Sequence, residues 1–163
     1  KNLIVTSVLF ALSKTFSPVY GYKELEAIFG DRRPESAKEL EEAVRAVRAR
    51  KLPDPKVLPN AGSFFKNPVV TRTKMLHLLE ETPSLVSYPL GGARAKIAAG
   101  WLIEACGLKG KRMGQAGVYE RQALILVNYG GATGAEIKDL AEEVARNVKY
   151  RFGVELEPEP VIL

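Results

Sequence analysis

The sequence predicts an α+β fold in which helices and strands follow one another without a regular repeat. Three observations support this class. Apolar runs at 2–13 and 123–128, the first of them rich in β-branched residues, are typical of strands. Capping-box patterns, SAKE at 36–39 and TGAE at 133–136, mark the starts of two helices. Proline- and glycine-rich segments separate the elements, and strands do not alternate with helices as they do in parallel α/β folds.

The N-terminal third is predicted to contain one strand and one helix. Residues 2–13 are expected to form a strand buried on both faces, because the run is almost entirely apolar. Residues 16–22 are interpreted as a connection. A helix is expected over 37–50, and it must end before Pro53. The face of this helix that points inward is predicted to carry Leu40, Ala43, Val44 and Val47.

Residues 51–67, KLPDPKVLPNAGSFFKN, are predicted to form a stiff polar connection. Their three prolines exclude a helix and a central strand. Gly62 permits a sharp turn or a close approach to a ligand immediately before Ser63. Function is often carried by loops that rigid elements hold in place. Composition alone, however, favours a plain connector here.

The C-terminal part is predicted to contain three helices and two strands. Thr71 caps a helix that Pro83 stops near residue 81, and an irregular segment follows at 84–95. The elements expected after it are a helix over 96–106, a strand over 123–128, a helix from Thr133 to about 150 and an extended strand over 154–163. In that last strand, the side chains of Glu157 and Glu159 are expected to face the same side.

Composition limits the classes of function. The net charge of +5 suits nucleic acid or an anionic small molecule. The basic residues are scattered, and the cluster at 109–112 has no interleaved aromatic residues, so a nucleic-acid platform is not indicated. His77 and Cys106 are the only residues of their types, which excludes a usual Cys/His zinc site and an internal disulfide. With no membrane-length apolar run and no leader, we expect a cytosolic protein or a fragment.

Several motifs, in order, resemble one family. They are NAGSFFKNPVV at 60–70, Tyr88-Pro89, KIAAGWLIEACGLKG at 96–110, ERQALILVN at 120–128 and LEPEP at 156–160. Together they resemble the flavin-dependent UDP-N-acetylenolpyruvoylglucosamine reductases of bacterial peptidoglycan synthesis, and the resemblance covers essentially the whole chain.

Because that family's chains are much longer, the resemblance implies that this chain is a C-terminal half. The implied organisation is the C-terminal piece of a FAD-binding domain over 1–52, a substrate-binding domain over 53–153 and a returning strand over 154–163. The N-terminal half of the enzyme, with most of the flavin site and a catalytic arginine, would be missing.

The resemblance implies an oxidoreductase of the cytoplasm that serves cell wall biogenesis, cell shape and cell division. NADPH would reduce FAD, and the flavin would pass a hydride to UDP-N-acetylglucosamine enolpyruvate, which becomes UDP-N-acetylmuramate. The alternative is an isolated UDP-sugar-binding module without redox activity. A basic nucleic-acid binder rests on net charge alone, and neither a nucleic-acid nor a membrane partner is expected.

The resemblance also implies roles for individual residues, and no metal site. Ser63 would donate a proton to the substrate enolate, where residue chemistry alone suggests a turn serine. Glu159 would polarise the substrate carboxylate, which requires the glutamate to be protonated or bridged by a cation; alone it is an exposed glutamate. Arg48 would lie near the flavin. The implied substrate contacts are Lys51, Asn67, Tyr88, Lys109 and Gln122, which could otherwise be ordinary solvated, turn or packing residues.

Overall fold

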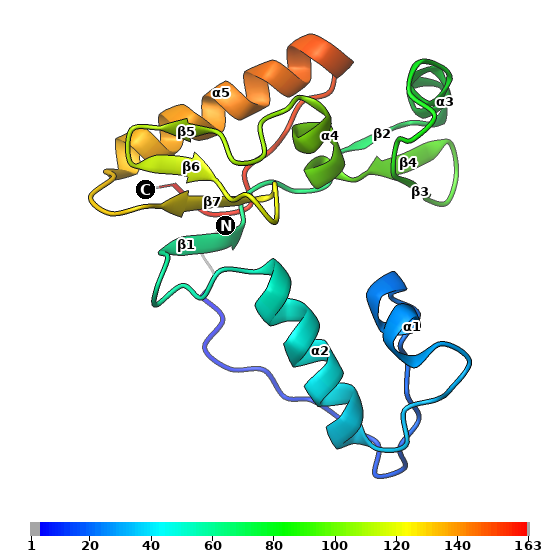
Figure 1. The fold of residues 1–163 in the computed structure, drawn as a ribbon. Helices are drawn as coiled ribbons and strands as arrows, with labels where there is room; N and C mark the ends of the chain where they lie inside the picture. The colour runs from blue at the N-terminus through cyan, green and yellow to red at the C-terminus, as the bar shows by residue number, and fades with distance from the viewer. Residues whose placement is uncertain (1–3, 163) are drawn as a thin grey trace. The chain divides into compact units, whose positions relative to one another are not determined.

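The computed structural model describes residues 4–162 and confirms the α+β class (Figure 1). The chain forms two compact units, Lys1–Arg50 and Lys51–Leu163. Helices make up the regular structure described in the first unit, and the second combines helices with two antiparallel sheets. No helix within residues 4–162 is both long and apolar enough to cross a membrane.

The strand predicted at 2–13 is wrong for the part that the structure describes. Residues 4–13 form neither a strand nor a helix, and the side chain of Leu9 is fully exposed. Residues 2 and 3 lie outside the described residues. A buried strand needs a neighbouring strand for its backbone hydrogen bonds, and the described part of the first unit contains no strand. The apolar sequence is therefore extended and exposed.

Two helices follow in the first unit. The sequence did not predict α1, Lys23–Phe29, whose buried Leu25 and Phe29 lie one turn apart. The predicted second helix is α2, Ala37–Lys51, and Ser36 Oγ accepts a hydrogen bond from the Glu39 amide at 3.2 Å. The inward stripe of α2 is only half-buried, and no residue of this helix is fully buried.

The capping box at the start of α2 is modified. The Glu39 carboxylate accepts a hydrogen bond from the Glu35 amide at 2.6 Å instead of from Ser36, and it also pairs with Arg32. The Glu35 hydrogen bond, followed by the Arg32 contact, holds the pKa of Glu39 below its ordinary value of 4.5. The carboxylate thus still satisfies a backbone donor at the helix start.

The larger sheet of the second unit has the order β1-β7-β6-β5, and every neighbouring pair is antiparallel. Its strands are β1 Asn60–Ser63, β7 Ile125–Asn128, β6 Ala116–Val118 and β5 Arg112–Met113. The predicted strand at 123–128 is confirmed as β7. The sequence did not predict β5 and β6. The predicted stiff connection contains β1, but this strand lies at the sheet edge, in agreement with the prolines that exclude a central position.

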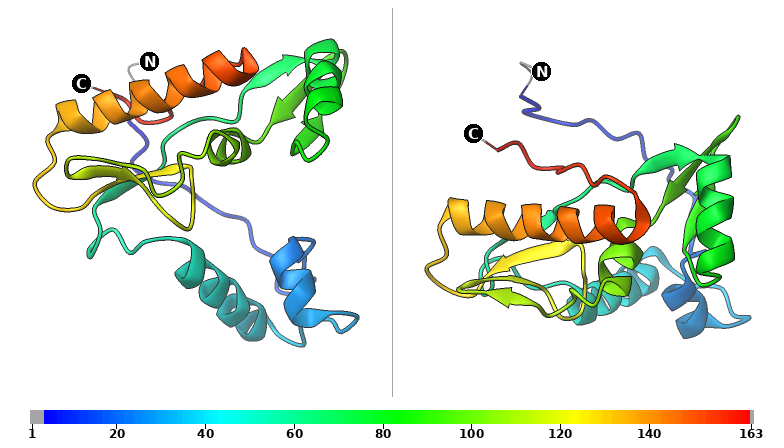
Figure 2. Two further views of the ribbon diagram at one scale, coloured as in Figure 1. Left: turned by 45° about the horizontal axis from the view of Figure 1, so that its top comes forward. Right: turned by 90° about the horizontal axis from the view of Figure 1, so that it is seen from above.

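The long helix α5, Gly134–Phe152, packs against this sheet, and α4, Ala99–Ala105, lies beside it (Figures 1 and 2). The predicted box is complete at α5: Thr133 Oγ1 accepts from the Glu136 amide at 3.2 Å, and the Glu136 carboxylate accepts from the Thr133 amide at 2.8 Å. The core between these elements is made by Val118, Leu126, Leu140, Val144 and Val148, among others.

The smaller sheet has the order β2-β4-β3. Its strands are β2 Val69–Thr71, β4 Arg94–Ile97 and β3 Ser87–Pro89, and α3, Arg72–Glu81, packs against β2 and β4. The predicted helix after Thr71 is confirmed. Two predictions are wrong: residues 84–95 are not wholly irregular, and the helix expected at 96–106 begins only at Ala99, because Lys96 and Ile97 pair within β4.

The strand predicted at 154–163 does not form over residues 154–162. This segment follows Gly153, whose left-handed backbone (φ 61°) ends α5, and it makes one isolated bridge, between Pro158 and Phe65. Pro158 and Pro160 lack an N–H group and cannot extend a hydrogen-bond ladder. Val154 and Leu156 are nevertheless buried, so the segment is fastened to the second unit.

Candidate functional site

Ser63 is the last residue of β1 and is exposed at the edge of the larger sheet. The pairing with β7 is irregular between Asn60 and Ser63, and Gly62 there has a φ of +74°. Asn60 Oδ1 accepts from the Gly62 amide at 3.0 Å and supports this turn. The buried Phe64 follows, and its amide donates to the Leu124 carbonyl at 2.7 Å. A glycine-dependent bulge and a buried anchor thus present Ser63 at the surface.

Glu159 is brought next to this bulge by the C-terminal segment. Its amide donates to the Phe64 carbonyl at 2.8 Å, and the Lys66 amide donates to the Glu157 carbonyl at 2.9 Å. Ser63 is the neighbour of Phe64 in the chain, so two regions nearly a hundred residues apart in sequence meet here. The Glu159 side chain is exposed, while Glu157 pairs with Lys66. The structure therefore brings together the two predicted catalytic residues at the level of the backbone.

Asn67 and Gln122 each lie next to the first turn of α4. Asn67 Oδ1 accepts a hydrogen bond from the Ala99 amide at 2.9 Å, and so caps a helix whose own N-cap residue makes no side-chain bond. Gln122 Oε1 lies 3.4 Å from the place a Cβ on Gly100 would take. The small Gly100 leaves room for the glutamine amide. Two of the predicted substrate contacts are thus both placed at the start of α4.

The other predicted residues lie elsewhere. Tyr88 is in β3 of the smaller sheet, directly opposite Lys96, and its side chain is 52% exposed. Lys109 follows α4 and pairs with Glu104 near the end of that helix opposite to Asn67. Arg48 is exposed on α2 in the first unit, and Lys51 is the last residue of α2 and the first of the second unit.

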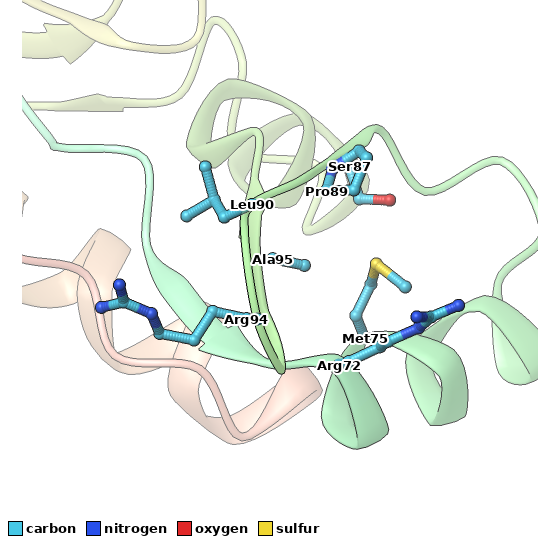
Figure 3. Close-up of a pocket in the computed structure, with 8 residues that line it drawn as sticks. Arg72, Met75, Ser87, Pro89, Leu90, Arg94 and Ala95 are labelled. Atoms are coloured by element: carbon cyan, nitrogen blue, oxygen red, sulfur yellow. The ribbon is translucent and has the colours of Figure 1, made fainter.

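A cavity of about 250 Å³ lies on the α3 side of the smaller sheet (Figure 3). None of the predicted site residues lines it. Its walls include Met75 from α3 and Pro89 and Ala95 from the sheet, which make it mainly apolar. In Figure 3 the Arg94 side chain points away from Met75 and Arg72, and this agrees with the alternation of side chains along β4.

Metal and thiol chemistry find little support in the described residues. Within residues 4–162, no three histidine, cysteine, aspartate or glutamate side chains gather in a group that could hold a metal ion. Cys106 is partly buried, and this burial raises the pKa of its thiol despite the nearby Arg151. A raised pKa favours the protonated thiol, and Cys106 packs against the hydrophobic core.

Comparisons with known proteins find one family. A family model described as the C-terminal domain of UDP-N-acetylenolpyruvoylglucosamine reductase matches residues 54–163. The UDP-N-acetylenolpyruvoylglucosamine reductase of Paraburkholderia xenovorans is 52% identical over 166 residues and covers 99% of this chain and 48% of its own length. The corresponding reductase of Chromobacterium violaceum is 52% identical over 165 residues, with the same coverage of 99% and 48%.

A solved structure is also similar. The crystal structure of UDP-N-acetylenolpyruvylglucosamine reductase from Thermus caldophilus has 29% sequence identity and a TM-score of 0.43, and the match covers 79% of this chain and 36% of that chain. The chain thus spans about half the length of the curated relatives it matches.

Proposed function

This chain belongs to the UDP-N-acetylenolpyruvoylglucosamine reductase family, in the part that forms the C-terminal domain, and from this we propose that it binds the substrate and donates a proton in such a reductase. The substrate would be UDP-N-acetylglucosamine enolpyruvate, and the product UDP-N-acetylmuramate. We place this reaction in peptidoglycan synthesis in the cytoplasm. The chain alone would not catalyse it.

One observation carries the proposal: the bulge at Gly62 and the C-terminal segment meet at Phe64. The bulge leaves Ser63 exposed, and the hydrogen bond from the Glu159 amide to the Phe64 carbonyl holds a carboxyl-bearing residue beside it. A hydroxyl donor and a carboxyl group near one point are the groups that protonation of an enolate requires.

The proposed chemistry at Ser63 follows from the reaction type. Reduction of an enolpyruvyl ether adds a hydride to one carbon of a double bond and a proton to the other. Negative charge then accumulates on the carbon beside the substrate carboxylate, and Ser63 Oγ–H gives its proton to that carbon. A hydroxyl is a weak acid, but an enolate carbon is a strong base, so the transfer is feasible if water is excluded. Glu159, either protonated or bridged by a cation, would polarise the substrate carboxylate and so stabilise this charge.

The remaining site residues would hold the substrate. The amides of Asn67 and Gln122 beside α4 can recognise polar groups of the sugar or the enolpyruvyl part. The Tyr88 hydroxyl and the ammonium groups of Lys51 and Lys109 suit phosphate oxygens. In the structure Lys109 pairs with Glu104, so its contact with substrate would require that pair to open.

FAD and NADPH belong to the proposal only through the family. Arg48 is exposed on a helix without a fully buried residue, and the described residues of its unit build no cradle around it. They do not by themselves fit a flavin. We therefore propose that FAD, which supplies the hydride when bound, is held mainly by the N-terminal part of the full-length enzyme.

Replacing Ser63→Ala in the full-length enzyme tests the proton-donor role. We expect NADPH to reduce the flavin at the usual rate, while substrate turnover falls by about 1,000-fold or more, because general acid catalysis contributes up to about 10⁴-fold. Stopped-flow absorbance of the flavin separates the two half-reactions. Ser84→Ala, in an exposed turn, is the matched control. Equal loss of both half-reactions contradicts the role.

The second candidate is a UDP-sugar-binding module without redox chemistry, which the half-length match favours. An absorbance spectrum of the purified 163-residue chain distinguishes the two. If this chain alone binds FAD and oxidises NADPH in a substrate-dependent way, our proposal that FAD is held mainly by the N-terminal part is wrong. If the upstream half is added and no activity appears, the enzyme proposal itself fails and the module remains.

A further inference from the structure

Glu159 lies at the end of the anchored part of the C-terminal segment. Upstream of it, the side chains of Val154 and Leu156 are buried and fasten the segment to the second unit. Downstream of it, the side chain of Val161 is 84% exposed. The contacts made by residues 157–159 therefore determine how firmly the segment is held where it carries Glu159.

A short antiparallel pairing joins residues 157–159 to residues 64–66. Its centre is the isolated bridge between Phe65 and Pro158, and the two backbone hydrogen bonds described above lie on either side of this bridge. Two such bonds make a weak attachment, because the net contribution of each to stability is small. A side-chain contact across the same pairing therefore adds a comparable share of the attachment.

Lys66 and Glu157 make such a side-chain contact. The Lys66 amide donates to the Glu157 carbonyl, and Lys66 Nζ also donates to the Glu157 carboxylate. The two side chains are 48% and 73% exposed, so this ion pair contributes little to the stability of the whole unit. Its effect is local, because it lies two residues before Glu159 and three residues after Ser63.

The backbone around Lys66 is fixed on both sides. The side chain of Phe65 is buried, and Asn67 Oδ1 accepts a hydrogen bond from the Ala99 amide at 2.9 Å. Lys66 thus extends from an anchored piece of chain. The ion pair therefore restrains the C-terminal segment, which is the less firmly held of the two partners.

We infer that Lys66 is a positioning residue, whose ion pair with Glu157 keeps the Glu159 carboxyl group beside Ser63. This inference rests on the proposed function, in which Glu159 polarises the substrate carboxylate and Ser63 donates the proton. Lys66 acts through the segment and not on the reacting atoms. Without the ion pair, Glu159 occupies its productive position for less of the time, and the rate of substrate reduction falls accordingly.

Charge reversal in the full-length enzyme tests this role. Lys66→Glu places two carboxylates opposite each other, and we expect kcat to fall about tenfold because Glu159 is displaced. KM for the enolpyruvyl substrate should change by less than about twofold, since Lys66 does not hold the substrate. Stopped-flow absorbance should show reduction of the flavin by NADPH at the wild-type rate. The double variant Lys66→Glu/Glu157→Lys restores opposite charges and should recover most of kcat.

The Glu159→Gln background separates positioning from a merely structural role. There, Lys66→Glu should lower kcat no further, because the carboxyl group that Lys66 positions is already absent. Additive losses, or a double charge reversal that recovers no activity, overturn the positioning role. If Glu159→Gln turns over like the wild type, the proposed function of Glu159 fails instead. Loss of turnover in Glu159→Gln but not in Lys66→Glu refutes the positioning role alone.

The matched control is Lys149→Glu, which breaks a second exposed ion pair to the same segment. Lys149 Nζ lies 2.6 Å from Glu155 Oε1, upstream of the bridge. This variant should change kcat by less than about twofold, because the residues that hold Glu159 are untouched. An equal fall in both single variants contradicts a specific role for Lys66. If Lys66→Glu does not fold, Lys66→Gln replaces it, with an expected fall in kcat of about two- to fivefold.

Discussion

At the scale of single residues, the bulge around Gly62 determines where Ser63 points. A Cβ at position 62 would meet no atom within 4 Å, so contacts of a Cβ with its neighbours do not select glycine there. The backbone conformation selects glycine, because φ at position 62 is +74°, a region that is unfavourable for residues with a Cβ. Position 62 therefore requires glycine for its backbone conformation. This position directly precedes Ser63, the proposed proton donor.

Gly62→Ala should lower both stability and activity. We expect the free energy of unfolding to fall by about 1–2 kcal/mol, the usual cost of the left-handed conformation for a residue with a Cβ. Relief of this strain would displace Ser63, so turnover by the full-length enzyme should fall while UDP binding persists. Denaturant titration and steady-state kinetics measure the two effects.

Two variants control for the loss of glycine as such. Gly91 lies in an exposed turn without a positive φ, so Gly91→Ala should be close to neutral. Gly62→Asn should retain more activity than Gly62→Ala, because asparagine tolerates the left-handed region. Wild-type turnover in Gly62→Ala would show that the bulge does not position the serine.

At the scale of elements, the helices with local capping signals were predictable. Thr71 Oγ1 accepts from the Lys74 amide at 3.2 Å at the start of α3, as the sequence around Thr71 indicated. The same holds for α5, where both bonds of the capping box are present. A cap depends on residues only three positions apart, so the pattern is visible in sequence.

The strands were harder to predict because their partners are distant in sequence. β1 pairs with β7, more than sixty residues later, and each strand within the described residues has four residues or fewer. Lys96 illustrates the consequence. Its apolar neighbours suit a helix as well as a strand, and only the pairing with Val69 and Tyr88 decides for β4. The face that Lys96 shares with Tyr88 was therefore invisible at the level of sequence.

Removing the cap of α5 should destabilise the second unit. Thr133→Ala should lower the free energy of unfolding by about 1 kcal/mol at neutral pH, because the Glu136 amide loses its acceptor. Denaturant titration of the purified chain measures the change. Thr73→Ala, an exposed threonine inside α3, is the control, and an equal loss there would argue against a specific role for the cap.

This cap should also depend on pH. Hydrogen bonds from the Thr133 backbone and then its side chain lower the pKa of Glu136 from its ordinary value of 4.5. The Glu136 carboxylate therefore contributes its full stabilisation above the pKa that it has in the unfolded chain. This stabilisation is lost as pH falls through the lower pKa that Glu136 has in the folded protein. Glu136→Gln should destabilise less, relative to wild type, at acidic pH than at pH 7. Thermal unfolding at several pH values tests this, and a constant difference contradicts it.

At the scale of the whole molecule, the first unit exposes an unusual amount of apolar surface. The side chains of Ile4, Val5, Val8, Leu9, Phe10 and Leu12 are all exposed. A continuous apolar run of this kind marks a surface that associates with another protein surface. The match covers 48% of the length of the Paraburkholderia xenovorans relative. A chain of that greater length has further residues that can cover this apolar surface.

The purified chain should therefore self-associate through this run. We expect Leu9→Asp to reduce the average mass seen by sedimentation velocity, because Leu9 is 100% exposed within the run. Tyr150→Asp is the matched control: Tyr150 is 94% exposed, but it lies apart in sequence, on α5. A monomeric wild-type chain, or an equal effect of both substitutions, contradicts this prediction.

The sequence by itself determined the α+β class, the helices α2, α3 and α5, the strand β7 and the family. These rest on short-range caps, on periodicity and on ordered motifs, all of which are local. Only the tertiary structure decided that residues 4–13 form no strand, that Glu159 is held beside Ser63 through Phe64, and that Asn67 caps α4. Each of these depends on which distant backbone groups find a partner, and local sequence does not encode that pairing.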